Sequence, residues 1–252
     1  MSISANLWPL MHFELSSSTF SINLDLFKKD IFMLKKIGII LSISTLISNA
    51  AFADDTGKWS VKLYGGISTM GDQSIEQTGV PGVTAGATGT INSDNGFMAG
   101  GSVGYNYTNN LSVELAWDYR SNDSKTNFSN GTSFNDGNFA SNILFVNGKY
   151  TFDTIHQTNL RPYIGAGLGY VQEIDLDLVT GGVEYSYSKN NEMAYQFMTG
   201  ITYTLTKKID LDAGLRYVRA DSINLKRENG SGELRNVDYD PLSLAIGLSY
   251  KF

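Results

Sequence analysis

The chain has 252 residues, with 26 Gly, 14 Tyr and 13 Phe but only 4 Pro and no Cys. Charged residues make up 17% of it, below the usual quarter of a globular protein, and its formal net charge is −6. The lack of Cys excludes a disulfide framework and cysteine metal sites, and an acidic chain without a basic stripe argues against binding to nucleic acid.

An export signal is predicted at residues 33–53. It begins with the positive segment Met33-Leu-Lys-Lys and continues with an apolar run at residues 37–47, which is too short for a helix that spans a membrane. The small-x-small sequence around Ala51 and Ala53 predicts cleavage directly after Ala53. A retained membrane anchor is the weaker alternative, because no long stop-transfer segment follows.

Residues 1–32 precede this signal and do not look like part of it. They include Trp8 and Pro9 together with the acidic residues Glu14, Asp25 and Asp30. Our hypothesis is that translation starts at Met33 and that residues 1–32 are not native to the protein. A longer, unusual leader that starts at Met1 is the alternative. Residues 54–252 are then expected to form a single domain.

Eight strands are predicted in that domain from the alternation of apolar and polar side chains. The clearest, at residues 111–119, places Leu111, Val113 and Leu115 on one face and Glu114 and Asp118 on the other. The strand at 139–152 is ambiguous, because Ile143 and Phe145 fall on the face opposite Leu144 and Val146. The eight expected ranges are 58–70, 96–107, 111–119, 139–152, 160–171, 193–205, 209–219 and 239–252.

The last strand alternates strictly and ends on an aromatic residue. Apolar side chains recur at every second position from Leu242, and the chain closes with Tyr250 and Phe252. A soluble sheet protein has no reason to end on an exposed Phe. The strands of an outer-membrane barrel are apolar towards lipid and carry aromatic residues at the membrane interface.

The connections between the predicted strands alternate in length. Three are short, whereas the other four, at residues 71–95, 120–138, 172–191 and 220–238, are long and polar. Short turns on one side and long loops on the other are typical of outer-membrane barrels, with the short turns in the periplasm. Because a sheet in lipid cannot leave an edge unpaired, the pattern predicts an all-β fold, an eight-stranded antiparallel transmembrane β-barrel.

Four segments carry a resemblance to a known family: residues 161–170 (RPYIGAGLGY), 195–203 (YQFMTGITY), 210–217 (DLDAGLRY) and 250–252 (YKF). Through them the chain resembles small eight-stranded outer-membrane proteins of the OmpA-like and opacity-protein type, over about residues 57–252. The resemblance implies exposure on a Gram-negative cell and, variously, adhesion, serum resistance, envelope integrity or weak porin activity. It also implies that Tyr250 and Phe252 form the signal read by the barrel assembly machinery.

Ionisable residues recur on the face opposite the predicted lipid stripe. An eight-stranded barrel is only wide enough for its own side chains, and buried opposite charges must pair to offset their desolvation. We therefore expect a plug of ion pairs inside the barrel; a pore lined with charge is the alternative. The predicted interior network comprises Lys62, Glu114, Asp118, Lys149, Asp212 and Arg216, with Lys251 near the base.

Few residues are candidates for catalysis. His156 is the only histidine after the predicted cleavage site and falls in a short periplasmic turn, so a Ser-His-Asp arrangement at the outer rim cannot be assembled. No catalytic residue, cofactor or metal site is predicted. The glycines from Gly165 to Gly169 follow the strand period of two rather than a phosphate-loop spacing. We expect them to leave space for large neighbours or to permit curvature of the strand.

The four long segments are the remaining functional surface. Their composition predicts mobile, poorly ordered loops. The first hypothesis is a non-catalytic surface protein that acts through these loops in adhesion, host interaction or envelope integrity, with host surface or serum proteins as partners. A small-solute porin is the alternative, and a lipid-modifying enzyme is the least favoured. Lipid and lipopolysaccharide should surround the barrel. Arg120 and Arg219 near the outer rim are candidate contacts to phosphates, with a generic role at the membrane interface as the alternative.

Overall fold

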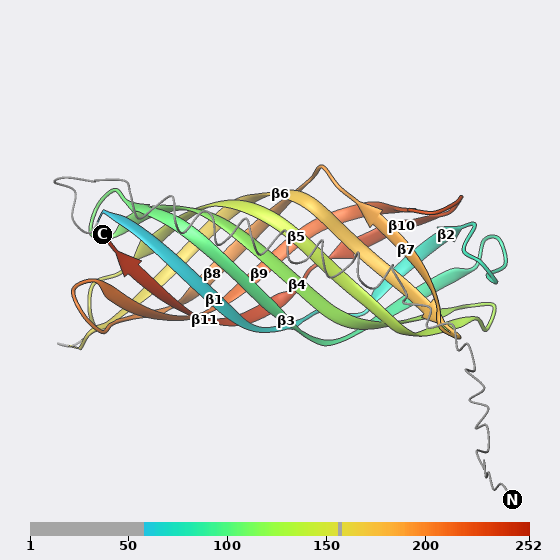
Figure 1. Ribbon diagram of the computed structural model, residues 1–252, viewed down its shortest axis with the longest axis horizontal. Helices are drawn as coiled ribbons and strands as arrows, with labels where there is room; N and C mark the ends of the chain where they lie inside the picture. The colour runs from blue at the N-terminus through green and yellow to red at the C-terminus, as the bar shows by residue number, and fades with distance from the viewer. Residues whose placement is uncertain (1–57, 156–157) are drawn as a thin grey trace, which may run out of the picture. The chain divides into compact units, whose positions relative to one another are not determined.

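The computed structural model describes residues 58–155 and 158–252. The predicted export signal with Ala51 and Ala53, the segment 1–32 and His156 lie outside the described residues. Within the described ranges no helix is long and apolar enough to span a membrane. These residues form eleven strands in one antiparallel sheet, shown in Figure 1.

The strands follow one another along the chain with short connections. They are β1 (Trp59–Thr69), β2 (Gln73–Thr78), β3 (Thr88–Asn106), β4 (Leu111–Phe128), β5 (Ser133–Thr151), β6 (Leu160–Thr180), β7 (Val183–Lys189), β8 (Glu192–Thr204), β9 (Ile209–Arg227), β10 (Glu233–Tyr239) and β11 (Leu242–Lys251).

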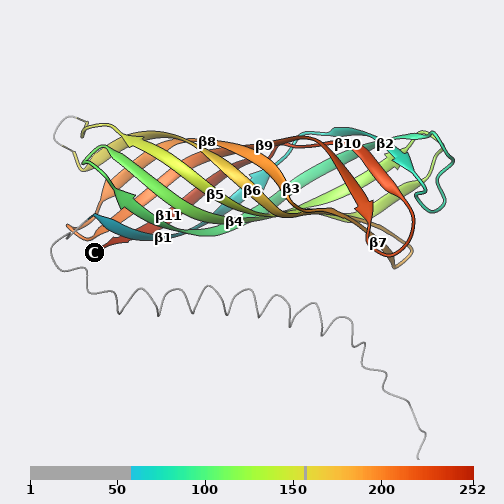
Figure 2. The same cartoon turned by 90° about the horizontal axis from the view of Figure 1, so that it is seen from above.

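Eight of these strands close into a ring. Neighbours pair in the order β1, β3, β4, β5, β6, β8, β9 and β11. The last strand then pairs with the first, with Ser60 opposite Lys251 and Thr69 opposite Leu242. The ring confirms the predicted eight-stranded antiparallel barrel, and two views of it are given in Figures 1 and 2. We call the end where β1 begins and β11 ends the proximal end, and the opposite end the distal end.

A second ring continues the barrel towards the distal end. There β2, β7 and β10 take the places of β1, β8 and β11. Hydrogen-bonded pairing runs from β10 to β2 and β3 on one side, and from β6 to β7 and β9 on the other. Because β9 also pairs with β10, the distal ring is closed as well.

Three of the eight barrel strands are therefore interrupted rather than ended. The breaks lie at residues 70–72, 190–191 and 240–241. Asn191 has a φ of 63°, in the left-handed region that Asn tolerates better than most residues. Pro241 has no backbone N–H to donate to a neighbouring strand. These residues let the chain change direction and then resume its pairing.

The prediction of four long, mobile loops is wrong for most of the residues involved. The segments predicted as loops contain β2, β7, β10 and the distal parts of β3, β4, β5, β6 and β9. Only residues 79–87, 129–132, 181–182 and 228–232 connect the strands at the distal end. The reason is that small polar residues occur on both faces of these segments and obscure the alternation, although apolar residues such as Ile75, Ile91 and Leu225 are buried inside the distal ring.

The outer wall changes character along each strand, as β4 illustrates. Its outward residues begin with the exposed Leu111, Val113 and Leu115, pass through Trp117 and Tyr119, and continue as Ser121, Asp123, Lys125 and Asn127. The apolar and aromatic stretch has the length of a membrane-crossing strand. With a tilt of about 40°, the remaining polar stretch of β4 carries the wall roughly 20 Å further.

Large and small side chains alternate between neighbouring strands inside the barrel. Ile143 and Phe145 are fully buried, whereas Val146 is exposed, which resolves the ambiguous strand: the first two point inward. Phe145 fits because Gly169 on β6 has no side chain, and a Cβ atom there would lie 2.9 Å from Cγ2 of Ile143 and against the Phe145 ring. The expectation that these glycines leave space for large neighbours is confirmed at Gly169.

Candidate functional site

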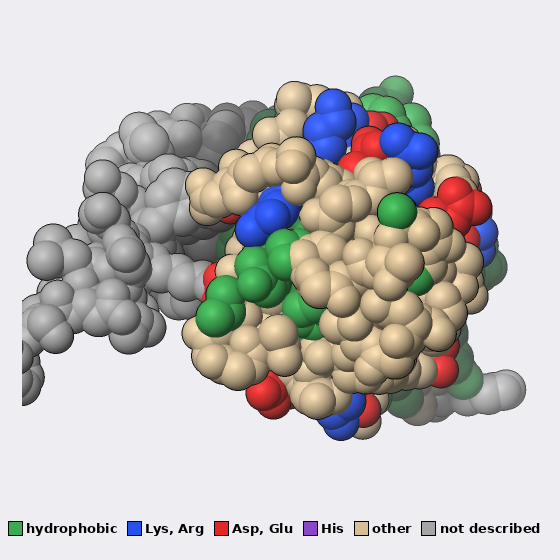
Figure 3. Space-filling view, turned by 90° about the vertical axis from the view of Figure 1, so that its right-hand side faces the viewer, with side chains coloured by type: hydrophobic (Ala, Val, Ile, Leu, Met, Phe, Trp, Pro, Cys, Tyr) green, Lys and Arg blue, Asp and Glu red, His purple; other side chains and the backbone are tan. Residues whose placement is uncertain are grey.

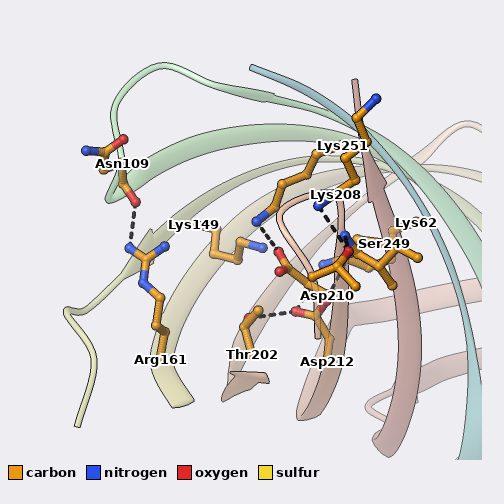
Figure 4. Close-up of polar contacts among 12 residues, drawn as sticks. Lys62, Asn109, Lys149, Arg161, Thr202, Lys208, Asp210, Asp212, Ser249 and Lys251 are labelled. Atoms are coloured by element: carbon orange, nitrogen blue, oxygen red, sulfur yellow. Dashed lines mark hydrogen bonds and ion pairs between the residues drawn. The ribbon is translucent and has the colours of Figure 1, made fainter. Parts of the chain in front are cut away.

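Ion pairs fill the proximal part of the barrel interior. The Lys62 Nζ atom lies 3.4 Å from Glu114 Oε1 and 3.4 Å from Asp212 Oδ1. Lys149 Nζ lies 2.9 Å from the same Glu114 oxygen. Their side chains are at most 13% exposed. Glu114 therefore bridges two lysines, and Figure 4 shows Lys62, Lys149 and Asp212 facing one another across the lumen.

A second layer of charge lies around Asp118. This carboxylate accepts hydrogen bonds from the Tyr64 hydroxyl and, at 2.9 Å, from Arg120 Nη2. Arg216 Nη1 lies 3.8 Å from it, and the Arg216 guanidinium stacks over the Tyr64 ring at 4.0 Å. All six predicted interior residues thus lie in the lumen, in two clusters.

The assignment of Arg120 to the outer rim is wrong. Its side chain is fully buried and makes hydrogen bonds to Asp118 and, through Nε at 3.2 Å, to Ser243 Oγ. The error came from ending the predicted strand at Tyr119. Because β4 continues to Phe128, Arg120 keeps the same phase as Glu114 and Asp118 and points inward.

Neutral polar side chains of the barrel strands make hydrogen bonds within the interior network. Thr202 Oγ1 and Ser249 Oγ donate to the two oxygens of Asp212 at 2.8 Å and 3.0 Å. Gln196 Nε2 donates to Asn147 Oδ1 at 3.0 Å. These groups satisfy acceptors that a low-dielectric interior would otherwise leave unpaired.

The distal part of the interior is mainly apolar. Phe139 is fully buried and its ring centroid lies 5.3 Å from that of Tyr239, whose hydroxyl is 2.6 Å from Ser141 Oγ. The surrounding cluster includes Ile91, Phe128, Phe134, Val171, Ile174, Leu176, Leu178, Val218, Leu225, Leu234 and Val237. Above the proximal mouth the lumen is therefore filled, by ion pairs first and by apolar side chains beyond them.

The sequence matches the model of the outer-membrane protein β-barrel domain over residues 39–252. The chain belongs to this outer-membrane β-barrel family. Its location is accordingly the outer membrane of a Gram-negative cell.

Solved structures are similar to the chain at low identity. The outer membrane protein OprG from Pseudomonas aeruginosa is 16% identical, with a TM-score of 0.55 over 78% of this chain and 97% of its own. Neisserial surface protein A is 21% identical, with a TM-score of 0.46 over 79% of this chain and all of its own. Ail, the attachment invasion locus protein of Yersinia pestis, is 14% identical, with a TM-score of 0.37 over 77% of this chain and 99% of its own. No curated protein sequence matches the chain.

Membership of the outer-membrane barrel family orients the molecule. In such barrels the chain extends only a short way past the membrane on the periplasmic side and further on the extracellular side. Here the strands continue past the apolar belt at the distal end. The proximal end is therefore periplasmic, and the distal ring stands outside the membrane. The aromatic residues Trp117 and Tyr119, at the end of the apolar belt, lie where interfacial aromatic residues are usual in this family.

The distal end of this outer-membrane barrel is a packed surface. In the end-on view of Figure 3, backbone and small polar side chains cover most of the described face, with charged groups around them and a hydrophobic patch among them. The connection at residues 79–87 has no charged residue. It is fixed by the buried Val80, by Thr132 Oγ1 donating to the Gly82 carbonyl at 2.9 Å, and by Gln77 Nε2 donating to the Thr84 carbonyl at 2.8 Å.

Charged residues of the distal wall pair with one another. Arg219, the second proposed lipopolysaccharide contact, is bonded to Asp221 and lies 3.8 Å from Asp238. Asp240 accepts a hydrogen bond from Gln73 Nε2 at 2.8 Å, and burial raises the pKa of its carboxyl above the usual range. A role of Arg219 towards phosphates stays a prediction, and it would have to compete with these carboxylates.

The described part of the chain, residues 58–155 and 158–252, contains many Asp and Glu side chains. Within these ranges no cluster of three or more His, Asp or Glu is placed to hold a metal ion. His156 lies outside these ranges.

Proposed function

We propose that this chain is a non-catalytic outer-membrane surface protein, in which the membrane-spanning barrel is an anchor and the distal ring makes contact with host surface or serum proteins. The observation that carries the proposal is the continuation of the closed barrel beyond its apolar belt. An anchor alone needs strands of about 9 to 11 residues, whereas β4, β5 and β6 have 18, 19 and 21.

An ordered extension suits recognition better than a loose one. A flexible loop loses conformational entropy when it binds, and that loss weakens the complex. Here the distal strands pair around the ring, and apolar residues such as Phe134 and Leu234 are buried between them. The surface that they present is thus formed before any partner arrives.

Charge suggests the kind of partner. The outward residues of the distal strands include many carboxylates, among them Glu76, Asp94, Asp123, Glu173, Glu184 and Asp221. Basic residues are fewer, and the tip at residues 79–87 is uncharged. Electrostatic complementarity raises association rates and excludes like-charged partners, so a basic protein surface is favoured. A contribution to envelope integrity, through neighbouring membrane components, is the second form of the same proposal.

The alternative function of a small-solute porin receives no support from the geometry. The bore at the level of Glu114 and Asp118 is occupied by paired side chains, and the bore above them by an apolar cluster. A solute would have to displace both layers.

A shortened tip tests the proposal. We expect replacement of residues 81–87 by a short Gly-Ser segment to leave the barrel folded while reducing binding to host cells or serum factors several-fold. Val80 is retained because it is only 3% exposed and packs in the distal core. The measurement is binding of whole cells that display the protein, with the gel mobility of unheated and boiled samples as the test of folding.

The matched control is Lys207→Gln, which alters an exposed residue in a turn at the periplasmic end. It should leave both binding and heat-modifiable mobility unchanged. Binding that persists in the shortened variant would exclude an adhesive role for this tip.

A further inference from the structure

A polar cavity lies at the periplasmic mouth of the barrel. Its volume is about 150 Å³, enough for a molecule the size of an amino acid rather than for a drug-sized ligand. The side chains that concern its chemistry are Ser112, Lys149, Arg161, Asp210 and Lys251, and most of them are visible in Figure 4. They come from five strands of the ring, β4, β5, β6, β9 and β11, so the barrel itself holds them in place.

Three cations line the cavity and are held by different partners. Lys251 Nζ lies 2.6 Å from Asp210 Oδ2, and Lys149 Nζ lies 2.9 Å from Glu114 Oε1. Arg161 is oriented by backbone carbonyls alone: its Nη2 donates to Asn109 O at 2.6 Å and its Nε to Phe152 O at 3.2 Å. These bonds hold the Arg161 guanidinium at the mouth of the cavity, and neither of them is to a carboxylate.

Two buried polar atoms of the cavity have no hydrogen-bond partner. They are Ser112 Oγ and Asp210 Oδ1, and their residues are 5% and 6% exposed. An ionised carboxylate oxygen can only accept hydrogen bonds, so Asp210 Oδ1 requires a donor. Buried polar atoms without a partner are rare in proteins and call for a ligand or for bound water.

These groups together define the ligand. A simple anion would satisfy the three cations but would leave Asp210 Oδ1 without a donor. A simple amine would satisfy Asp210 but would face three positive charges. We propose that the periplasmic mouth binds a small zwitterion, whose ammonium group donates to Asp210 Oδ1 and whose carboxylate or phosphate contacts Lys149, Lys251 and Arg161.

The same chemistry occurs in free periplasmic solutes and in the ethanolamine phosphate headgroup of membrane lipids. The test uses phosphoethanolamine as probe, titrated by calorimetry into the full chain folded in detergent. We expect saturable binding at least tenfold tighter than that of inorganic phosphate or of ethanolamine. Equal affinity for inorganic phosphate, or no saturable binding, would overturn the proposal.

Variants connect the binding to the cavity. Asp210→Asn and Arg161→Gln should each weaken phosphoethanolamine binding about tenfold. Lys207→Gln, which makes the same change of charge as Arg161→Gln but in a nearby turn, should not. If Asp210→Asn fails to show heat-modifiable folding, Arg161→Gln still decides, because Arg161 is held through backbone carbonyls. Unchanged affinity in a folded Arg161→Gln variant would also overturn the proposal.

Binding of the probe to the protein in lipid nanodiscs distinguishes a lipid headgroup from a free solute as the natural ligand. Choline headgroups have no N–H to donate, so phosphatidylcholine discs should leave the cavity free. A loss of affinity for the probe in phosphatidylethanolamine discs would identify the lipid headgroup as the natural zwitterion. Equal affinity for the probe in both kinds of disc would identify a free solute as the natural zwitterion. Both results presuppose that the probe binds in the cavity.

Discussion

Replacing Glu114 by Gln should lower the free energy of unfolding by about 3–5 kcal/mol, the cost of leaving a buried charge without its partner. Glu114 Oε1 lies 3.4 Å from Lys62 Nζ and 2.9 Å from Lys149 Nζ, so one substitution leaves two buried lysines with a single remaining carboxylate, Asp212. Urea unfolding of the refolded barrel, followed by the fluorescence of Trp59 and Trp117, measures the loss.

Two further variants make this result specific. The exposed pair of Asp94 and Lys125, 3.4 Å apart, provides a matched control, and Asp94→Asn should cost less than about 1 kcal/mol. The double variant Glu114→Gln, Lys149→Met removes opposite charges together and should recover part of the loss. A Glu114→Gln variant as stable as Asp94→Asn would show that the interior charges do not depend on one another.

The second large effect is expected in the distal ring. Phe139→Ala should cost about 3–5 kcal/mol, because the lost ring leaves a cavity in a packed core. Phe139 is fully buried and packs against Tyr239. We expect protease to cut the variant in the distal connections, at residues 79–87 or 228–232, while the membrane-spanning ring keeps its heat-modifiable mobility.

Val183→Ala is the matched control, because Val183 lies in the distal ring but is 49% exposed. It should change stability by no more than about 0.5 kcal/mol and should leave protease resistance intact. Rapid cutting of the unmodified protein at the same sites would contradict an ordered distal ring and would restore the prediction of mobile loops.

The sequence predicted the membrane-spanning ring because lipid imposes a strong pattern on it. Leu111, Val113 and Leu115 alternate with polar residues, and the apolar residues of β11 from Leu242 onward alternate with small or polar ones. The distal ring lacks this contrast, because water bathes its outer face and small polar residues occur on both faces of β3 and β4. Breaks at Asn191 and Pro241 also resemble the ends of strands. The result was a prediction of loops where the chain continues as barrel.

The prediction of the interior network also rested on the alternation of residues along a strand. It was incomplete because two inward residues, Arg120 and Tyr64, are of types that suggested other places. Glu114 and Asp118 are charged residues in phase on a clear strand, so their inward direction followed from the spacing of two. Arg120 has the same phase but lies past the apolar stretch, where a basic residue suggested contact with lipopolysaccharide. Tyr64 gave no signal either, because an aromatic residue on a barrel strand usually suggests the lipid interface. Its inward direction could have been inferred from Lys62, two residues before it.

The filled lumen is tested most directly by planar-bilayer recording of the purified, refolded barrel. We expect little or no steady conductance, because the ion pairs around Glu114 and Asp118 and the apolar cluster around Phe139 occupy the bore. A large, stable channel would contradict a closed barrel and would make the small-solute porin the better description of the protein.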